Sequence, residues 1–137
     1  MIKKLPSPRE KLAGCVWLPR ILAKARLFQA DKLPPDYAAN LCSPGRTDSF
    51  FMAHFGLSRE DVLTAATWSD AKVSEWFLSR SSAERIEQWN ETALNLGRSG
   101  YPLAERLPVA LATTYRNVAH LKPTTIFEVL EADEKDA

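Results

Sequence analysis

The chain has 137 residues, of which 45% are hydrophobic and 26% charged, an ordinary balance for one globular domain. Its 18 basic and 17 acidic residues leave a net charge of +1, so the composition provides neither a basic field for nucleic acid nor an acidic field for a basic partner. The two cysteines are too few for a disulfide scaffold.

The composition favours helices. Leucine and alanine total 35 residues, whereas the β-branched valine and isoleucine total only 10. No clear alternation with a period of two predicts a strand. We therefore expect an all-α fold, a compact single-domain orthogonal bundle of about six to eight short helices over residues 1–137. The ends, residues 1–6 and 133–137, are expected to fray.

Capping signals and apolar periodicity place the helices along the chain. A Ser or Thr followed three residues later by an acid is typical of a helix start, and glycine is typical of a helix end. The cap pattern occurs at Ser7/Glu10, Ser58/Asp61, Ser81/Glu84 and Thr125/Glu128. The predicted helices span residues 8–13, 17–30, 48–55, 59–66, 70–79, 82–96, 103–120 (broken or kinked near Pro108) and 126–132.

The segment over residues 31–46 is predicted to be a loop, because it contains three prolines and Gly45. A structureless loop of that length is usually either functional or disordered. Its side chains include Tyr37 and Asn40, which both donate and accept hydrogen bonds and so are suited to hold a ligand. The alternative for these two residues is local stabilisation of turns.

Two cations on the 17–30 helix suggest a site. Arg20 and Lys24 are four residues apart, so they stand together along one edge beside Trp17. They repel each other unless an anion or a carboxylate lies between them, and Arg grips carboxylates and phosphates with paired hydrogen bonds. We expect an anion-recognition edge here. The alternative is a solvated flank with ordinary salt bridges to Asp31, Asp36 or Glu87.

Asn90 is the polar exception on the apolar face of the 82–96 helix. A buried amide is costly unless it is hydrogen-bonded, so Asn90 is expected either to bond the backbone of residues 31–46 or to face a ligand cavity. The four tryptophans, at positions 17, 68, 76 and 89, are expected to be core mass. Basic residues are not expected to interleave with them as they do in a nucleic-acid groove.

Other chemistries have little support in the sequence. The cysteines and histidines match no zinc-ligand spacing, and no glycine-rich phosphate loop is present, so we expect neither a metal nor a cofactor. An enzyme of unknown reaction is the alternative interpretation, with Cys42, His54 or Tyr37 as its reactive group. A fast-reacting Cys42 of low pKa would favour that alternative.

Several motifs occur in a familiar order. They are SPREKLAG from Ser7, WLPR from Trp17, KAR from Lys24, LPPDY from Leu33 with Asn40 after it, and IEQWN from Ile86. This order resembles a family of small, mostly bacterial proteins catalogued as domain of unknown function 5069. The Ala13-Gly14 pair departs from the Gly-Gly pair of that family. The resemblance implies a small, mainly helical soluble protein, and it supplies no activity, substrate, cofactor or catalytic residue.

The sequence as a whole predicts a cytoplasmic, non-catalytic module that binds a small anionic ligand or a protein partner. Its site would be the edge of the 17–30 helix and the 31–46 loop, with Arg20, Lys24, Tyr37, Asn40 and Asn90 as binding residues. The alternative enzyme would use the same cleft. We expect no nucleic-acid partner and no membrane, because no run approaches the ~18 apolar residues of a membrane span. No pattern specifies the oligomeric state.

Overall fold

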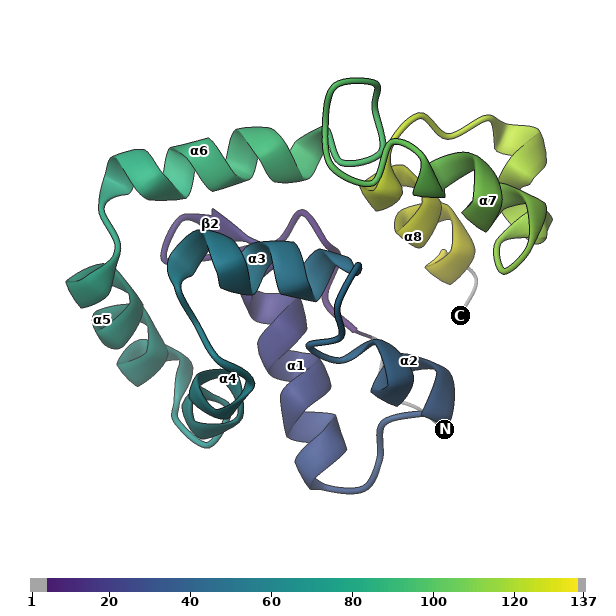
Figure 1. The fold of residues 1–137 in the computed structure, drawn as a ribbon. Coiled ribbons are helices and arrows are strands. Elements are labelled where there is room, and N and C mark those ends of the chain that lie inside the picture. The colour runs from purple at the N-terminus through teal and green to yellow at the C-terminus, as the bar shows by residue number, and fades with distance from the viewer. Residues whose placement is uncertain (1–4, 136–137) are drawn as a thin grey trace. The chain divides into compact units, whose positions relative to one another are not determined.

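The computed structural model describes residues 5–135 (Figure 1). It is 60% helical, and the described chain contains eight α-helices, one 3-10 helix and a two-stranded hairpin. The predicted all-α fold class is therefore confirmed. Internal contacts group the chain into two compact units, Met1–Trp89 and Asn90–Ala137. The expectation of a single domain stays a prediction.

The first unit contains the hairpin and most of the helices. Strand β1 (Lys11–Leu12) pairs antiparallel with β2 (Cys15–Val16). The helices that follow are α1 (Leu18–Gln29), α2 (Pro35–Asn40), α3 (Thr47–Phe55), α4 (Arg59–Ala65), α5 (Asp70–Arg80) and α6 (Ala83–Leu94). Helix α1 packs against α4, β1 and α2. The division between the two units falls within α6.

The core of the first unit is aromatic. Phe51 and Phe77 are fully buried, and their rings are stacked with centroids 6.3 Å apart. Trp89 is also buried and donates its indole N–H to the carbonyl of Val16 at 3.0 Å. Trp17 is the other buried tryptophan, so the expectation of core mass is right for two of the four. The tryptophans at positions 68 and 76 are only half-buried.

The helix predicted over residues 8–13 is wrong, because the chain makes the hairpin there. Ser7 accepts a hydrogen bond from the N–H of Arg9 at 3.2 Å, but this closes a turn rather than starting a helix. The cause is the pair that joins the strands. Ala13 and Gly14 both have positive φ, 55° and 75°, as a two-residue type I′ hairpin turn requires. Turn chemistry thus overrides the capping pattern.

Substitution of Ala13 by glycine is expected to stabilise the protein by about 0.5–1 kcal/mol. A left-handed conformation costs an L-residue roughly 1–2 kcal/mol, and the entropy of glycine in the unfolded chain returns part of that gain. Chemical denaturation measures the change. Ala53→Gly is the matched control, because Ala53 is exposed within α3 and the same exchange there should cost about 1 kcal/mol. Equal destabilisation by both variants would contradict the assigned turn.

Most of the other predicted helices are confirmed with ends shifted by one or two residues. Gly56 ends α3 with a left-handed φ of 66°, and Pro19 lies in the first turn of α1. Complete capping boxes, in which side chain and backbone bond reciprocally, begin two helices. They are Ser58/Asp61 at α4 and Thr125/Glu128 at α8 (Ile126–Glu134). At these positions the capping residues in the sequence and the packing of the helices favour the same helix ends.

Two predictions in the middle of the chain are wrong in detail. Residues 31–46 are not a structureless loop, because they contain α2, whose first residue is Pro35 with Asp36 in the first turn. Proline fixes a helical φ there and an acid favours the positive end of the helix dipole. At the start of α6, the N–H of Arg85 donates to the hydroxyl of Ser82 at 3.1 Å, so Ser82 and not Ser81 makes the cap.

The second unit is built from α7 (Arg106–Ala112), the 3-10 helix η1 (Arg116–Leu121) and α8. Leu107, Val118 and Val129 form a buried apolar cluster in this unit. The predicted 103–120 helix is broken after Ala112 rather than at Pro108, because Pro108 lies in the first turn of α7, where a missing N–H costs no helical bond.

Helix α8 includes residues 133–134, which were expected to fray; residues 1–4 and 136–137 lie outside the described chain.

No helix among residues 5–135 is long and apolar enough to cross a membrane. That finding comes from helix length as much as from hydropathy. The longest helices, α1 and α6, have 12 residues each, whereas a membrane-spanning helix needs about 20.

Candidate functional site

The site begins with a strained residue between the hairpin and α1. Trp17 has φ 75° and ψ −27°, a left-handed conformation that is rare for a bulky residue and costs of order 1–3 kcal/mol. The surrounding structure holds it there, because its backbone N–H bonds the carbonyl of Pro8 at 3.2 Å and its side chain is only 3% exposed. Its indole Nε1 donates to Oδ1 of Asp48 at 2.8 Å.

Asp48 is the centre of the site. It lies in the first turn of α3, where the helix dipole favours a negative charge, and it is 1% exposed. Lys24 Nζ contacts both carboxylate oxygens at 2.9 Å, and the backbone N–H of Cys42 donates to Oδ2 at 2.9 Å. With the Trp17 indole, the carboxylate accepts four hydrogen bonds. We call Trp17, Lys24, Cys42 and Asp48 the aspartate cluster.

Arg20 and Lys24 lie against one ring, as their spacing predicts. The Arg20 Cζ and the Lys24 Nζ lie 5.4 and 5.1 Å from the centroid of Trp17. Both residues are buried, 2% and 4% exposed, so they are not a solvated flank. Arg20 donates from Nη1 to the carbonyl of Pro6 at 3.1 Å. The carboxylate on Lys24 comes from Asp48, which was not among the predicted salt-bridge partners.

The segment after α1 is attached to this cluster at one end. Leu41 is buried, and its carbonyl accepts a hydrogen bond from Nη1 of Arg59 at 2.9 Å. Cys42, the next residue, has φ 57°, so the chain takes a second strained conformation where its N–H meets the Asp48 carboxylate. Tyr37 and Asn40 lie just before this point, half-buried on α2.

Asn90 is half-buried on α6 and opens the second unit, whereas the other four predicted binding residues belong to the first. Its predicted bond to residues 31–46 stays a prediction. The side chains of Asp48 and Arg59 anchor that segment through hydrogen bonds.

The thiols are poor nucleophiles in this environment. Burial raises the pKa of the Cys15 thiol from 9.0 to about 12. Burial, and after it the charge of Asp48, raises the pKa of the Cys42 thiol from 9.0 to about 11. His54 Nε2 lies 2.7 Å from the carbonyl of Arg85, to which it must donate. Within residues 5–135, Cys42 and His54 make no hydrogen bond to each other, so this pair lacks the geometry of an activated thiol.

Cys42 is expected to react with a disulfide reagent about 100-fold more slowly in the native protein than in denaturant at pH 8. The unfolded thiol has a pKa near 8.5, whereas the native thiolate becomes abundant only as the pH approaches 11, and the thiolate is the reactive form. The variant Cys15→Ser isolates the reaction of Cys42. A native rate equal to the unfolded rate would restore the enzyme interpretation.

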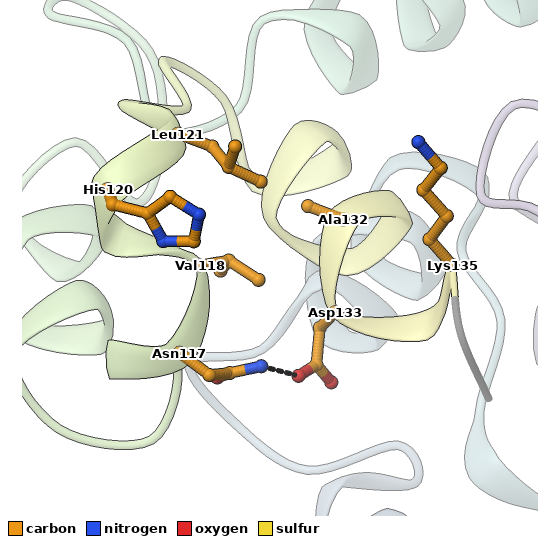
Figure 2. A pocket seen from close by; sticks show the side chains of 7 residues that line it. All are labelled: Asn117, Val118, His120, Leu121, Ala132, Asp133 and Lys135. Carbon is orange, nitrogen blue, oxygen red and sulfur yellow. Dashed lines mark hydrogen bonds between the residues drawn. The ribbon is translucent and has the colours of Figure 1, made fainter.

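A shallow groove lies in the second unit (Figure 2). Its volume is about 570 Å³, and η1 and α8 form its two sides. Asn117 donates to Oδ1 of Asp133 at 2.9 Å across one end, so these two polar groups satisfy each other. His120 and Lys135 also line the groove, and their polar groups lie beside the apolar side chains of Val118, Leu121 and Ala132. Among residues 5–135, no group of His, Cys, Asp or Glu side chains is arranged to hold a metal ion.

Sequence reasoning missed two features. Asp48 is one of 17 acidic residues, and its spacing from other residues in the sequence did not identify it as the partner of Lys24. The second is the pairing of cations with tryptophans, since Lys72 lies over Trp68 and Arg80 lies over Trp76; the expectation about a nucleic-acid groove stays a prediction. Their spacing of four residues is visible in the sequence and was the missed signal.

These observations define a small, mostly helical protein with a buried charged cluster. The chain belongs to the family described as domain of unknown function (DUF5069), whose model matches residues 2–136. No curated protein and no solved structure matches the chain. The predicted family is confirmed over essentially the whole chain.

Proposed function

We propose that the protein is a cytoplasmic, non-catalytic binding module that binds a protein partner through α2. One observation carries this proposal: α2 buries none of its residues, although the chain on both sides of it is fixed. A six-residue helix is not stable by itself in water, so the flanking anchors must hold it in place. A fixed helix with no fully buried residue is suited to contact another molecule.

Both flanks of α2 are held by backbone hydrogen bonds. Before it, Asp31 takes a left-handed φ of 56°, and the N–H of Lys32 bonds the carbonyl of Leu27 at 2.8 Å. After it, Leu41 is buried and the N–H of Cys42 bonds the aspartate cluster. The two strained residues of the cluster, Trp17 and Cys42, thus support the C-terminal anchor of α2. Fixed elements bind with a smaller entropy loss.

The surface of α2 suits a protein partner. Tyr37 is half-buried, and tyrosine is enriched among the residues that dominate protein interfaces. Ala39 is exposed and small, which allows close approach. The side-chain amide of Asn40 makes no hydrogen bond within residues 5–135, so its donors and acceptor are available to a partner.

The two competing interpretations have less support. A small anion at Arg20 and Lys24 would have to compete with Asp48, whose carboxylate already accepts two hydrogen bonds from Lys24. An enzyme that uses Cys42 would need a thiolate, whereas burial keeps this thiol protonated at neutral pH. The two cysteines are free, which agrees with a reducing cytoplasm.

Site-specific photocrosslinking in the cells that make the protein tests the proposal. A photoreactive residue at Ala39 is expected to give a discrete protein adduct, and the same residue at Glu84 on α6 is the matched control, because Glu84 is also exposed on a helix of the first unit. Tyr37→Ala with Asn40→Ala should abolish the adduct. The free energy of unfolding should change by no more than about 1 kcal/mol, because no residue of α2 is fully buried.

Three results would overturn it. The first is the absence of an adduct from Ala39, and the second is the same adduct from Ala39 and Glu84. The third is a rise in melting temperature with phosphate, sulfate or acetate, since a ligand that binds only the folded state stabilises it. That last result would favour a small anion.

A further inference from the structure

A row of aromatic and basic side chains runs from the turn before α5 along that helix, outside the surface of α2. Its members on α5 are Lys72, Trp76 and Arg80, whose spacing of four residues places them along one helix face, and Trp68 lies two residues before the helix begins. The Trp68 and Trp76 rings meet edge to face, with centroids 5.6 Å apart and planes at 77°. Lys72 Nζ lies 4.7 Å from the centroid of Trp68, and Arg80 Cζ lies 5.2 Å from that of Trp76. We call these four residues the tryptophan–cation row.

The protein holds both rings in place while the cations stay exposed. Trp76 is half-buried and its ring contacts that of Phe77, which belongs to the core, at 6.4 Å. The carbonyl of Trp68 accepts a hydrogen bond from Nη2 of Arg26 at 3.0 Å. Lys72 and Arg80 are exposed, yet each lies on a fixed ring face. The rings therefore restrict two long side chains before any partner arrives, which lowers the entropy cost of binding.

The charges of the row have an acidic neighbour in Asp61, whose pKa is lowered by hydrogen bonds from Ser58 and, after them, by the charge of Arg80. Lys72 makes no ion pair among residues 5–135, and Arg80 makes none there either, although it donates to the carbonyl of Gly56 at 3.3 Å. The nearby ion pair, at 3.1 Å, uses Arg26 and Asp70 instead. The row therefore presents two fixed positive charges that lack counter-charges within ion-pair distance.

The geometry selects the class of partner. Positions 72 and 80 are eight residues apart, about 12 Å along a helix axis. An extended peptide rises roughly 3.3–3.6 Å per residue, so two carboxylates three or four residues apart span this distance. Single-stranded nucleic acid needs open ring faces on which bases stack, whereas each ring here has a cation on one face. The net charge of +1 also provides no wider basic surface.

We propose that the tryptophan–cation row docks an extended acidic segment of a partner protein, with one carboxylate on Lys72 and another on Arg80. Arg offers a paired contact to a carboxylate, and Lys offers a point charge. Glu75, exposed on the same helix, weakens the positive field of the row. Removal of its charge should therefore strengthen the docking.

Titration with a synthetic peptide, followed by NMR of the tryptophan indole N–H signals, tests the proposal. The probe is a Gly/Ser peptide with two glutamates four residues apart. The signals of Trp68 and Trp76 should shift, while those of the buried Trp17 and Trp89 stay in place as internal controls. Lys72→Ala or Arg80→Ala should weaken the binding about three- to tenfold, and Glu75→Gln should strengthen it. A salt concentration of 0.5 M should remove most of the shift.

The matched probes decide the outcome. A peptide with glutamines in place of the glutamates should produce no shift. Equal shifts with that peptide, no shift at millimolar glutamate peptide, or binding by the Lys72→Ala and Arg80→Ala variants as strong as that of the wild type would each overturn the proposal. A stronger response to a short oligothymidine than to the acidic peptide would also overturn it and assign the row to single-stranded nucleic acid.

Discussion

Replacement of Asp48 by alanine is expected to destabilise the protein by about 3–5 kcal/mol, the usual cost of removing one partner from a buried ion pair. Lys24 would keep a positive charge at a site that is 4% exposed, with no carboxylate beside it. The indole N–H of Trp17 and the backbone N–H of Cys42 would lose their acceptor as well. Equilibrium denaturation in urea, with the slope compared between variants, measures the loss.

A surface ion pair provides the matched control for this experiment. Asp70 pairs with Arg26 at 3.1 Å, but its side chain is 67% exposed, so Asp70→Ala should cost at most about 1 kcal/mol. The double variant Asp48→Leu with Lys24→Met should recover much of the loss, because an apolar pair leaves no buried charge. A cost below about 1 kcal/mol for Asp48→Ala would contradict the assigned cluster.

The elements that the sequence predicted well are those with local causes. Pro19, Gly56 and the Ser58/Asp61 box act within one helical turn, and the structure uses all three as predicted. The error at residues 8–13 has a local cause too. The Ser7/Glu10 cap pattern competed with the Ala13-Gly14 turn, and hydrogen bonds between the two strands decided in favour of the turn.

The candidate site shows where local reasoning ends. The spacing of Arg20 and Lys24 correctly placed both beside Trp17, because both lie within the first two turns of α1 and Trp17 is its N-cap residue. Their carboxylate partner, Asp48, lies 24 residues beyond Lys24. Such a contact depends on how α1 and α3 pack, and no residue spacing encodes it. The burial of both cations follows from the same packing and was equally inaccessible.

Helix α2 illustrates a third case. Three prolines in residues 31–46 made a loop the natural prediction, although Pro35 followed by Asp36 is also a helix start. The sequence therefore contains a signal for a loop and a signal for a helix start. Residue propensity alone does not show which of the two conformations the segment adopts. The anchors at Leu41 and Cys42 depend on side chains elsewhere in the chain, Arg59 and Asp48. Tertiary contacts therefore decide the conformation of the segment that we propose as the binding surface.

Phe51→Ala is expected to cost about 3–5 kcal/mol, the range for removal of a fully buried aromatic ring. Phe51 lies one helical turn after Asp48 on α3, so the same helix carries the charged cluster and the aromatic core. Its ring centroid is 5.1 Å from that of Phe55, 6.3 Å from that of Phe77 and 5.4 Å from that of Trp89. Such pairs contribute beyond the area that they bury.

The exposed Leu78→Ala provides the contrast, since its side chain is 54% exposed and its loss should change the stability by no more than about 0.5 kcal/mol. Phe51→Leu should fall between the two, because leucine fills part of the cavity. An apolar cavity of this kind stays dry and accepts a small aromatic molecule, so benzene should raise the melting temperature of Phe51→Ala and leave the wild type unchanged. A cost below about 1 kcal/mol, or an equal response of both proteins to benzene, would mean that the ring does not fill a close-packed core.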